Sequence, residues 1–250
     1  MKSAGQCSER RGSTWSTRQI GGCGKWLQET ITVPGQSSEV RKHCNRLQFA
    51  PSLALSDYYD HHAAVFIATT RDVDMSEARG RFLAALPLRN GGPTRILDAG
   101  SGSGRDALAF RRLGYAVAAF DASPAMVAAT QAHAAVPTRL MRFEDFTWEH
   151  AFEGIWACAS LLHVAEADSP GVIGRLAAHL VPGGALYLSF KRGTGERLKD
   201  GRRFTDMTAE RLAALLDRCG DFGQPDIWQG RDCRPDRASE MWVNSVVKKA

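Results

Sequence analysis

The sequence predicts an open, mostly parallel α/β sheet with helices on both faces. Short apolar runs of strand length alternate with segments of helical pattern between residues 95 and 218, and this alternation is typical of successive βαβ units. The run at 154–160 is apolar, as expected for a strand covered on both faces. A glycine-rich turn at 100–104 connects the first strand to a helix. A ligand site is therefore expected at the carboxyl edge of the sheet.

Each element has its own local signal. A β-branched and aliphatic run precedes the glycines, and apolar periodicity resumes at 106–113. Ser123 before Pro124 is a strong helix start, because serine caps a helix and proline fits its first position. The predicted strands lie at 95–98, 115–120, 138–143, 154–160 and 185–190. The predicted helices lie at 106–113, 124–135, 169–180 and 208–218. Two later apolar segments, around 227–228 and at 242–247, are expected to close the sheet as a terminal hairpin.

The turn between the first strand and its helix indicates the kind of ligand. Its glycines at 100, 102 and 104 allow positive φ and a close approach of the backbone to a ligand. The dinucleotide fingerprint G-x-G-x-x-G would need a glycine at position 105, where this chain has Arg105. A carboxylate at Asp98 would repel a pyrophosphate but attract a cationic amino group. The loop therefore favours a cationic ligand over a dinucleotide.

An acid followed by G-x-G-x-G resembles motif I of the class I S-adenosylmethionine-dependent methyltransferases. The resemblance covers the order of elements from about residue 57 to residue 249. It implies a Rossmann-like fold with a seven-stranded sheet, and S-adenosylmethionine as cofactor. In that family the loop holds the methionine part of the cofactor. The resemblance therefore assigns this binding to Asp98, Gly100, Ser101, Gly102, Gly104 and Arg105.

Two further acids follow later strands. Asp121 lies twenty-one residues beyond Gly100, at the distance where a carboxylate can accept both ribose hydroxyls. Asp145 follows the third predicted strand, where an acid in the resembling family meets the adenine amino group. The resemblance also places Ala122 and Met126 beside the cofactor. An ordinary turn aspartate is the alternative for Asp121, and a solvated loop acid is the alternative for Asp145.

A narrower resemblance rests on segments spread along the chain. It involves residues 57–60, 120–126, 155–164, 201–206, 232–235 and 240–244. These segments are similar to a bacterial group described as type 11 or tellurite-resistance-related methyltransferases. The likeness implies the fold and the cofactor, but it does not name an acceptor.

Methyl transfer from a sulfonium mainly requires that an acceptor be aligned and water excluded, because the methyl group is already activated. The acceptor pocket is expected where the fourth strand ends, at Ser160 to His163, with Ser160 beside the cofactor. His163 is the candidate general base because imidazole titrates near neutral pH; packing against the following loop is the alternative. Tyr59 lies on a segment that could form a helix over the cofactor and contact it.

The segment at 191–206 is rich in lysine and arginine and has three glycines. It follows the fifth strand, beside the acceptor side of the crevice. One interpretation is recognition of an anionic or carboxylate-bearing acceptor, and the other is a mobile, solvated lid. Arg234 and Trp242 are further candidates for the pocket, with a core strand position favoured for Trp242.

Composition predicts one domain with an extension. Residues 1–50 have eight Lys/Arg and three Asp/Glu, whereas residues 51–250 have twenty-four of each sign. We expect 1–50 to be a flexible basic extension and 51–250 to be the methyltransferase domain. No apolar run is long enough to cross a bilayer. The scattered cysteines and the lack of a signal-peptide core predict a cytoplasmic protein.

The cysteines form no C-x-x-C pair and no zinc spacing, so no metal site is expected. Cys158 is expected inside the fourth strand as a small buried apolar residue. The chain lacks an Asn/Asp-Pro-Pro-Tyr/Phe motif after that strand and a Pro-Cys nucleophile motif, which disfavours methylation of nucleic-acid bases. For the extension, a solvated tail is favoured because it lacks clustered basic residues and interleaved aromatics; contact with nucleic acid or an acidic membrane surface is the alternative.

The function predicted from the sequence is methyl transfer from S-adenosylmethionine to a small-molecule acceptor, mainly through proximity and alignment. Two alternatives come from other classes. One is a NAD-dependent Rossmann oxidoreductase, which would bind NADH. The other is a non-catalytic regulator that binds S-adenosylmethionine and transfers nothing.

Overall fold

The computed structural model describes residues 51–88 and 91–250. The basic extension expected at 1–50 lies outside the described residues. Among the described helices, none combines the length and the apolar character needed to cross a bilayer.

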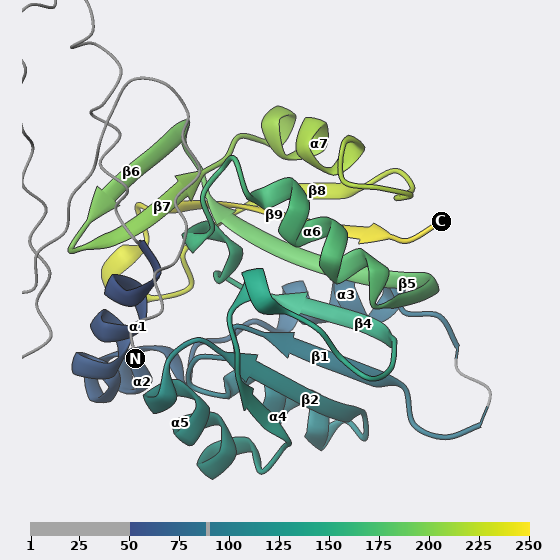
Figure 1. Cartoon of the computed structure of the whole chain (residues 1–250), viewed down its shortest axis with the longest axis horizontal. Helices are drawn as coiled ribbons and strands as arrows, with labels where there is room; N and C mark the ends of the chain where they lie inside the picture. Colours follow the sequence, from purple (N-terminus) through teal and green to yellow (C-terminus); the bar gives the residue numbers. More distant parts are fainter. Residues whose placement is uncertain (1–50, 89–90) are drawn as a thin grey trace, which may run out of the picture. The chain divides into compact units, whose positions relative to one another are not determined.

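A seven-stranded sheet forms the centre of the described part, with the strand order β3-β2-β1-β4-β5-β9-β8 (Figure 1). The strands are β1 (Arg95–Ala99), β2 (Ala116–Asp121), β3 (Thr138–Leu140), β4 (Phe152–Ala157), β5 (Leu180–Lys191), β8 (Asp226–Arg231) and β9 (Met241–Lys248). β1 to β5 pair in parallel, and β9 runs antiparallel to both β5 and β8. The predicted open, mostly parallel sheet with a terminal hairpin is confirmed. Within this hairpin, the later strand β9 pairs with β5, and β8 lies at the edge of the sheet.

Helices cover both faces of this sheet, as predicted. The described α-helices are α1 (Pro51–His61), α2 (Ala63–Thr70), α3 (Ser76–Ala85), α4 (Arg105–Arg112), α5 (Pro124–Ala134), α6 (Ser169–Ala178) and α7 (Ala209–Asp217). Of these, α1 packs on α5 and on β7 (Arg202–Asp206), and α2 packs on α1 and α5. Alternate residues of β5 belong to two separate cores: Leu186 packs with α6 and α7, whereas Tyr187 packs with α3 and α4. Figure 1 shows α6 in front of the sheet and α3 behind it. This two-sided burial explains why the central strands are apolar along their whole length.

The core behind the sheet is an aromatic cluster. Trp156 stacks on Tyr187 with ring centroids 3.8 Å apart, and Phe82 of α3 meets Trp156 edge-on at 5.3 Å. A Cβ at Gly154 would lie 2.5 Å from Cζ of Phe82. Glycine is therefore required there, because α3 packs directly on the backbone of β4.

Two predicted strands end earlier in the structure. β3 ends at Leu140, and Phe143–Asp145 form the short 3-10 helix η2. β4 ends at Ala157, so Cys158 lies in the turn after the strand and is only partly buried. The expectation of a strand-core cysteine was wrong. The cause is Ala159, whose positive φ of 52° turns the chain away from the sheet.

The basic segment at 191–206 is not an open loop. It folds into the antiparallel pair β6 (Gly195–Lys199) and β7 (Arg202–Asp206), separate from the main sheet. The carboxylate of Asp206 binds Nε of Arg197 at 2.6 Å, and that of Glu196 binds Nη1 of Arg203 at 2.9 Å. Ladder hydrogen bonds and these ion pairs give the segment a defined conformation.

Candidate functional site

The glycine loop after β1 is bound to the end of β2. The amides of Gly100 and Ser101 donate to the Phe120 carbonyl at 2.9 and 3.1 Å. The amide of Gly102 donates to Oδ2 of Asp121 at 2.9 Å. All three loop glycines have positive φ, between 53° and 77°. The loop therefore has the left-handed turns that its sequence predicts.

Close packing also requires glycine at two of these positions. A Cβ at Gly100 would lie 2.4 Å from Cβ of Ser160, which follows β4. A Cβ at Gly104 would lie 2.9 Å from Cα of Thr130 in α5. The loop thus fits between two neighbouring elements with no room for side chains. On its other side the loop lines a cavity.

Two cavities adjoin at this loop. The smaller has a volume of about 280 Å³ and the larger about 470 Å³. Both are lined by Gly100, Gly102, Tyr59, Phe66 and His163. An elongated ligand could therefore pass beside the loop from one cavity into the other.

Asp98 lines the larger cavity at the end of β1 and is only 3% exposed. Its Oδ2 accepts a hydrogen bond from the Ala107 amide in the first turn of α4, at 3.0 Å. Burial, together with the nearby charge of Asp106, raises the pKa of Asp98 well above its usual range. A cationic ligand group beside Asp98 would offset this cost and favour the ionised carboxylate.

Asp121 lines the smaller cavity at the end of β2. Its oxygens accept from the backbone amides of Gly102 and Ser123, at 2.9 and 3.0 Å. Burial raises the pKa of Asp121, although these backbone hydrogen bonds oppose the shift. Each carboxylate oxygen has a further lone pair, so the fixed side chain can still accept from a vicinal diol.

The rest of the smaller cavity suits a flat, largely apolar group. Met126 lies in the first turn of α5, where its amide donates to the capping hydroxyl of Ser123. The predicted residues Ala122, Met126 and Ser160 line this cavity together with Phe120, Met141 and Phe143. Apolar walls with a few polar groups are typical of cofactor pockets.

Asp145 does not lie where the sequence predicted. It is exposed and lines neither of the two cavities, whereas its neighbour Glu144 lines the smaller one. Both residues belong to η2. Successive residues of a 3-10 helix project about 120° apart, so only one of two adjacent acids faces the cavity.

Arg105 lines the larger cavity, but its guanidinium is bound to a buried acid. Nη2 and Nε of Arg105 bind the Asp106 carboxylate at 2.6 and 3.2 Å. Arg79 and the indole of Trp156 donate to the same carboxylate at 2.7 and 3.0 Å. Burial opposes ionisation, yet Arg105 and Arg79 lower the pKa of Asp106. This network joins α3, α4 and β4 beneath the cavity floor.

Tyr59 and His163 meet where the two cavities join. The Tyr59 hydroxyl lies 2.8 Å from Nε2 of His163, and Nδ1 lies 2.7 Å from the Arg203 carbonyl. A carbonyl only accepts, so Nδ1 carries the proton and Nε2 accepts from Tyr59. Burial lowers the pKa of His163 to about 4. The imidazole is therefore neutral at pH 7, and its free lone pair is engaged by the tyrosine.

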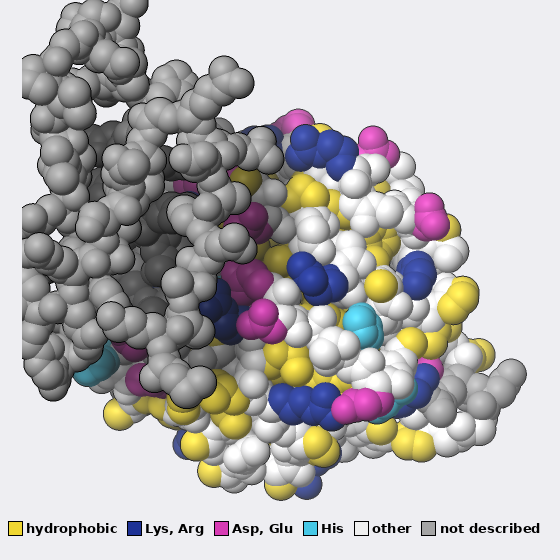
Figure 2. Space-filling view, viewed as in Figure 1, with side chains coloured by type: hydrophobic (Ala, Val, Ile, Leu, Met, Phe, Trp, Pro, Cys, Tyr) yellow, Lys and Arg dark blue, Asp and Glu magenta, His cyan; other side chains and the backbone are white. Residues whose placement is uncertain are grey.

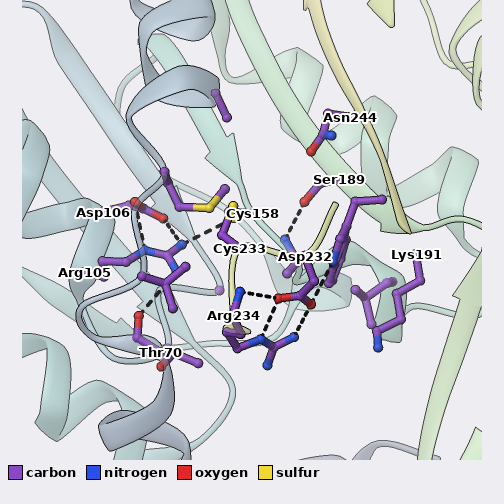
Figure 3. A pocket seen from close by; sticks show the side chains of 18 of the residues that line it. Thr70, Arg105, Asp106, Cys158, Ser189, Lys191, Asp232, Cys233, Arg234 and Asn244 are labelled. Carbon is purple, nitrogen blue, oxygen red and sulfur yellow. Dashed lines mark hydrogen bonds and ion pairs between the residues drawn. The ribbon is translucent and has the colours of Figure 1, made fainter. Parts of the chain in front are cut away.

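The outer wall of the larger cavity comes from β5, β9 and the β8–β9 connection (Figure 3). Arg234 and Trp242 both line it, although a purely core position was favoured for Trp242. Sequence reasoning missed Ser189, Asn244 and Asp232, which line the same wall. Alternation along β5 and β9 is the only signal in the sequence that could have indicated the first two.

Among the described residues, no group of three or more His, Cys, Asp or Glu side chains has the arrangement of a metal site. The described cysteines, Cys158, Cys219 and Cys233, are free thiols. Burial raises the pKa of Cys158 to about 12, which makes its thiolate a poor candidate nucleophile.

Comparison with known proteins agrees with this geometry. Residues 96–184 match the family model described as a methyltransferase domain. The ubiquinone biosynthesis O-methyltransferase of Xanthomonas axonopodis pv. citri (strain 306) is 34% identical over 129 residues, covering 49% of this chain and 52% of that protein. The chain therefore spans about half the length of that curated relative.

Two solved structures share the fold. The 1,6-didemethyltoxoflavin-N1-methyltransferase of Burkholderia thailandensis, crystallised with 1,6-didemethyltoxoflavin and S-adenosylhomocysteine, is 25% identical with a TM-score of 0.63. The alignment covers 80% of this chain and 89% of that one. The [4+2]-cyclase SpnF is 18% identical with a TM-score of 0.61, over 79% of this chain and 96% of that one. The latter likeness concerns the fold alone.

The residues around the loop fit the expected cofactor. Asp121 has free lone pairs toward the smaller cavity, Asp98 would gain from a cationic partner, and the glycine cradle leaves no space for side chains. The match of residues 96–184 to a methyltransferase domain, the strand order and this fit all agree with a domain that binds S-adenosylmethionine.

Proposed function

We propose that this protein transfers a methyl group from S-adenosylmethionine to a small-molecule acceptor. The observation that carries the proposal is the pair of cavities that meet at Gly100 and Gly102. The smaller cavity has the acid and the apolar walls that an adenosine group needs. The larger one begins at Asp98 and extends past the glycine loop, which leaves space for an acceptor.

The proposed cofactor contacts follow from this division. Asp121 would bind the ribose hydroxyls, and Asp98 the α-ammonium of the methionine part. Ala122, Met126 and Ser160 would enclose the adenosine. Glu144 replaces Asp145 as the candidate for the adenine amino group, because it lines the cavity.

Arg105 would support the methionine end of the site mainly by holding Asp106 and the start of α4. Gly104 would shape this end as well, since its packing on Thr130 fixes where the helix begins. Ser101 would also shape this end of the site, because its hydroxyl lies 2.9 Å from that of Thr130.

Catalysis is proposed to rest mainly on alignment. Bound S-adenosylmethionine supplies a methyl carbon that an acceptor lone pair attacks as the carbon–sulfur bond breaks and its electron pair stays on sulfur. His163 is the candidate base for an acceptor that must lose a proton. Because Tyr59 occupies Nε2, this proton would reach His163 through the tyrosine hydroxyl or after Tyr59 has moved away. With a pKa of about 4, the imidazole is a weak base, and alignment remains the larger effect.

A small acceptor agrees better with the described surface than a nucleic acid does. On the face seen in Figure 2, Lys and Arg side chains lie at separate places among uncharged and acidic ones. Nucleic-acid binding usually needs a continuous basic stripe. The basic side chains that line the larger cavity sit inside a space suited to a small molecule.

Calorimetric titration with S-adenosylhomocysteine, S-adenosylmethionine and NADH tests the cofactor. We expect the two adenosyl ligands to bind and NADH not to bind. Transfer of labelled methyl groups to a panel of small acceptors then tests the activity. Binding of NADH alone would support the oxidoreductase, and binding of S-adenosylmethionine without transfer to any acceptor would support the regulator.

Three finer assignments complete the proposal. Residues 51–250 are proposed to form the methyltransferase domain, and 1–50 a basic extension. The segments at 120–126 and 155–164 support membership of the type 11 or tellurite-resistance-related group. The free thiols at Cys158, Cys219 and Cys233 support a cytoplasmic location, since exported proteins tend to pair their cysteines.

A further inference from the structure

The outer wall of the larger cavity is built by strand register. In the antiparallel pair of β5 and β9, Ser189 lies opposite Asn244 and Lys191 lies opposite Trp242. Residues two apart on a strand share a face, so these four side chains belong to the same side of the sheet. All four line the larger cavity.

Lys191 brings a cation to this wall. Its side chain is 14% exposed and pairs with Glu240, which is 31% exposed. Nζ lies 5.6 Å from the ring centroid of Trp242 and 5.7 Å from that of Phe204. An ammonium has three N–H donors, so the pair with Glu240 leaves donors for a ligand.

Arg234 brings a second cation, and a neighbouring carboxylate holds its guanidinium in place. Its Nε and Nη2 donate to the carboxylate of Asp232 at 2.9 and 2.6 Å, and the indole of Trp242 donates to Asp232 at 3.0 Å. Among the described residues no hydrogen bond engages the other terminal nitrogen, Nη1. Figure 3 shows Arg234, Asp232 and Lys191 around one space. The indole of Trp242 is bound to the carboxylate that holds Arg234, and its ring lies beside Lys191.

Asn244 contributes a neutral donor to another part of the same wall, opposite Ser189. It is 7% exposed, and its Oδ1 accepts from the Tyr187 hydroxyl at 2.8 Å. With the oxygen occupied, the amide NH₂ is the group that remains for a ligand in the cavity. Lysine and arginine have no acceptor atoms, so this part of the wall offers donors.

The surrounding charges have the same sign. Along the end of β5, the strands β6, β7 and β8, and the β8–β9 connection, six cationic residues line the larger cavity against one acid, Asp232. The other acids of the lining lie near the glycine loop or on α3 and the turn before it. A partly enclosed cavity with such a wall concentrates anions.

We propose that Lys191 and Arg234 form an anion-binding subsite that anchors a carboxylate or phosphate group of the methyl acceptor. This inference rests on the proposed function, because it names the substrate class of the same cavity. The two anions share oxygen atoms that accept several charge-assisted hydrogen bonds. The subsite binds the acceptor at a distance from the glycine loop and leaves the atom that is methylated unspecified.

The test is calorimetry on the full chain saturated with S-adenosylhomocysteine, at constant ionic strength. The probes are benzoate, phenyl phosphate and the neutral analogue benzamide. We expect at least one anion to bind about tenfold or more tightly than benzamide. The comparison of benzoate with phenyl phosphate separates the two anion classes.

Variants assign the effect to the subsite. Lys191→Met and Arg234→Gln should each weaken anion binding about tenfold without changing the affinity for benzamide. Glutamine can still donate to Asp232, and Lys191→Met leaves only the partly exposed Glu240 unpaired, so this pair of variants guards against misfolding. The matched control is Lys248→Met, which removes an exposed lysine opposite Ala185, at the other end of the β5–β9 pair.

Equal binding of benzoate and benzamide, an absence of anion binding, or an equal effect of Lys191→Met and Lys248→Met would each overturn the subsite. The titration with S-adenosylhomocysteine alone tests the proposed function separately. If that ligand binds and the anions do not, the subsite fails while the methyltransferase function stands. If it does not bind, the anion titrations on the ligand-free protein still decide the subsite.

Discussion

The hydroxyl of Tyr59 lies 2.8 Å from Nε2 of His163, and this hydrogen bond joins α1 to the short 3-10 helix η3 (Leu161–His163) that follows β4. The two residues are 104 positions apart in the sequence. Both residues line both cavities, so their contact lies where the cavities adjoin. It also makes the neutral imidazole an acceptor, with its proton on Nδ1.

His163 should make the protein sensitive to acid. Burial lowers its pKa from an ordinary 6.5 to about 4, so between these values the unfolded chain binds more protons than the folded one. Stability is then fully present above pH 6.5 and falls as the pH drops toward 4, by up to roughly 3 kcal/mol. In urea unfolding at pH 7 and pH 4.5, His163→Gln should lose less stability than the unchanged chain. The same loss in both proteins would contradict the burial of a neutral imidazole.

Gly100→Ala should destabilise the fold by about 2 kcal/mol or more, because the new methyl group meets Ser160 and the backbone has positive φ. Affinity for S-adenosylhomocysteine should fall as well. The control is Gly171→Ala in α6, where no atom lies within 4 Å of the new Cβ. That variant should gain about 0.5–1 kcal/mol from helix propensity. Thermal unfolding measures both, and equal stability of the two variants would exclude the proposed packing.

Asp121→Asn should weaken binding of S-adenosylhomocysteine about tenfold, because one oxygen becomes a donor that faces either a ribose hydroxyl or a backbone amide. The fold should be retained, since the side chain keeps its shape. Calorimetry measures the affinity, and Asp217→Asn, an exposed position at the end of α7, is the matched control. Unchanged affinity of Asp121→Asn would remove the ribose assignment.

Asp106→Asn should cost about 3–5 kcal/mol, because Arg79 and Arg105 would lose their shared counter-charge in a buried place. Asp74→Asn is the control. The Asp74 side chain is 78% exposed, and its ion pair with Arg79 is long, at 3.9 Å. Its free energy of unfolding should change by about 0.5 kcal/mol or less. Chemical denaturation compares the two, and a small effect of Asp106→Asn would show that the network is dispensable.

Much of the fold could be predicted because its signals are local. Ser123 and Pro124 start α5 through capping and a fixed φ, and the glycines after Asp98 form the turn that their conformational freedom allows. Asp121 could be predicted for the same reason, since its place depends on the length of one βαβ unit. The length of β3 could not be predicted, and neither could the side chain of η2 that faces the cavity. Asp145 and Glu144 differ by one residue, and the sequence has no signal for which of them faces the cavity.

The sequence by itself determined the alternation of strands and helices, the glycine loop and the acids at the ends of β1 and β2, because periodicity and turn chemistry act over a few residues. Only the tertiary structure decided that β9 enters the sheet between β5 and β8, which brings Trp242 and Asn244 opposite Lys191 and Ser189. Strand register and the pairing of distant segments depend on how the whole chain buries its apolar faces. The outer wall of the larger cavity is made of such pairings, whereas the glycine loop is made of neighbours in sequence.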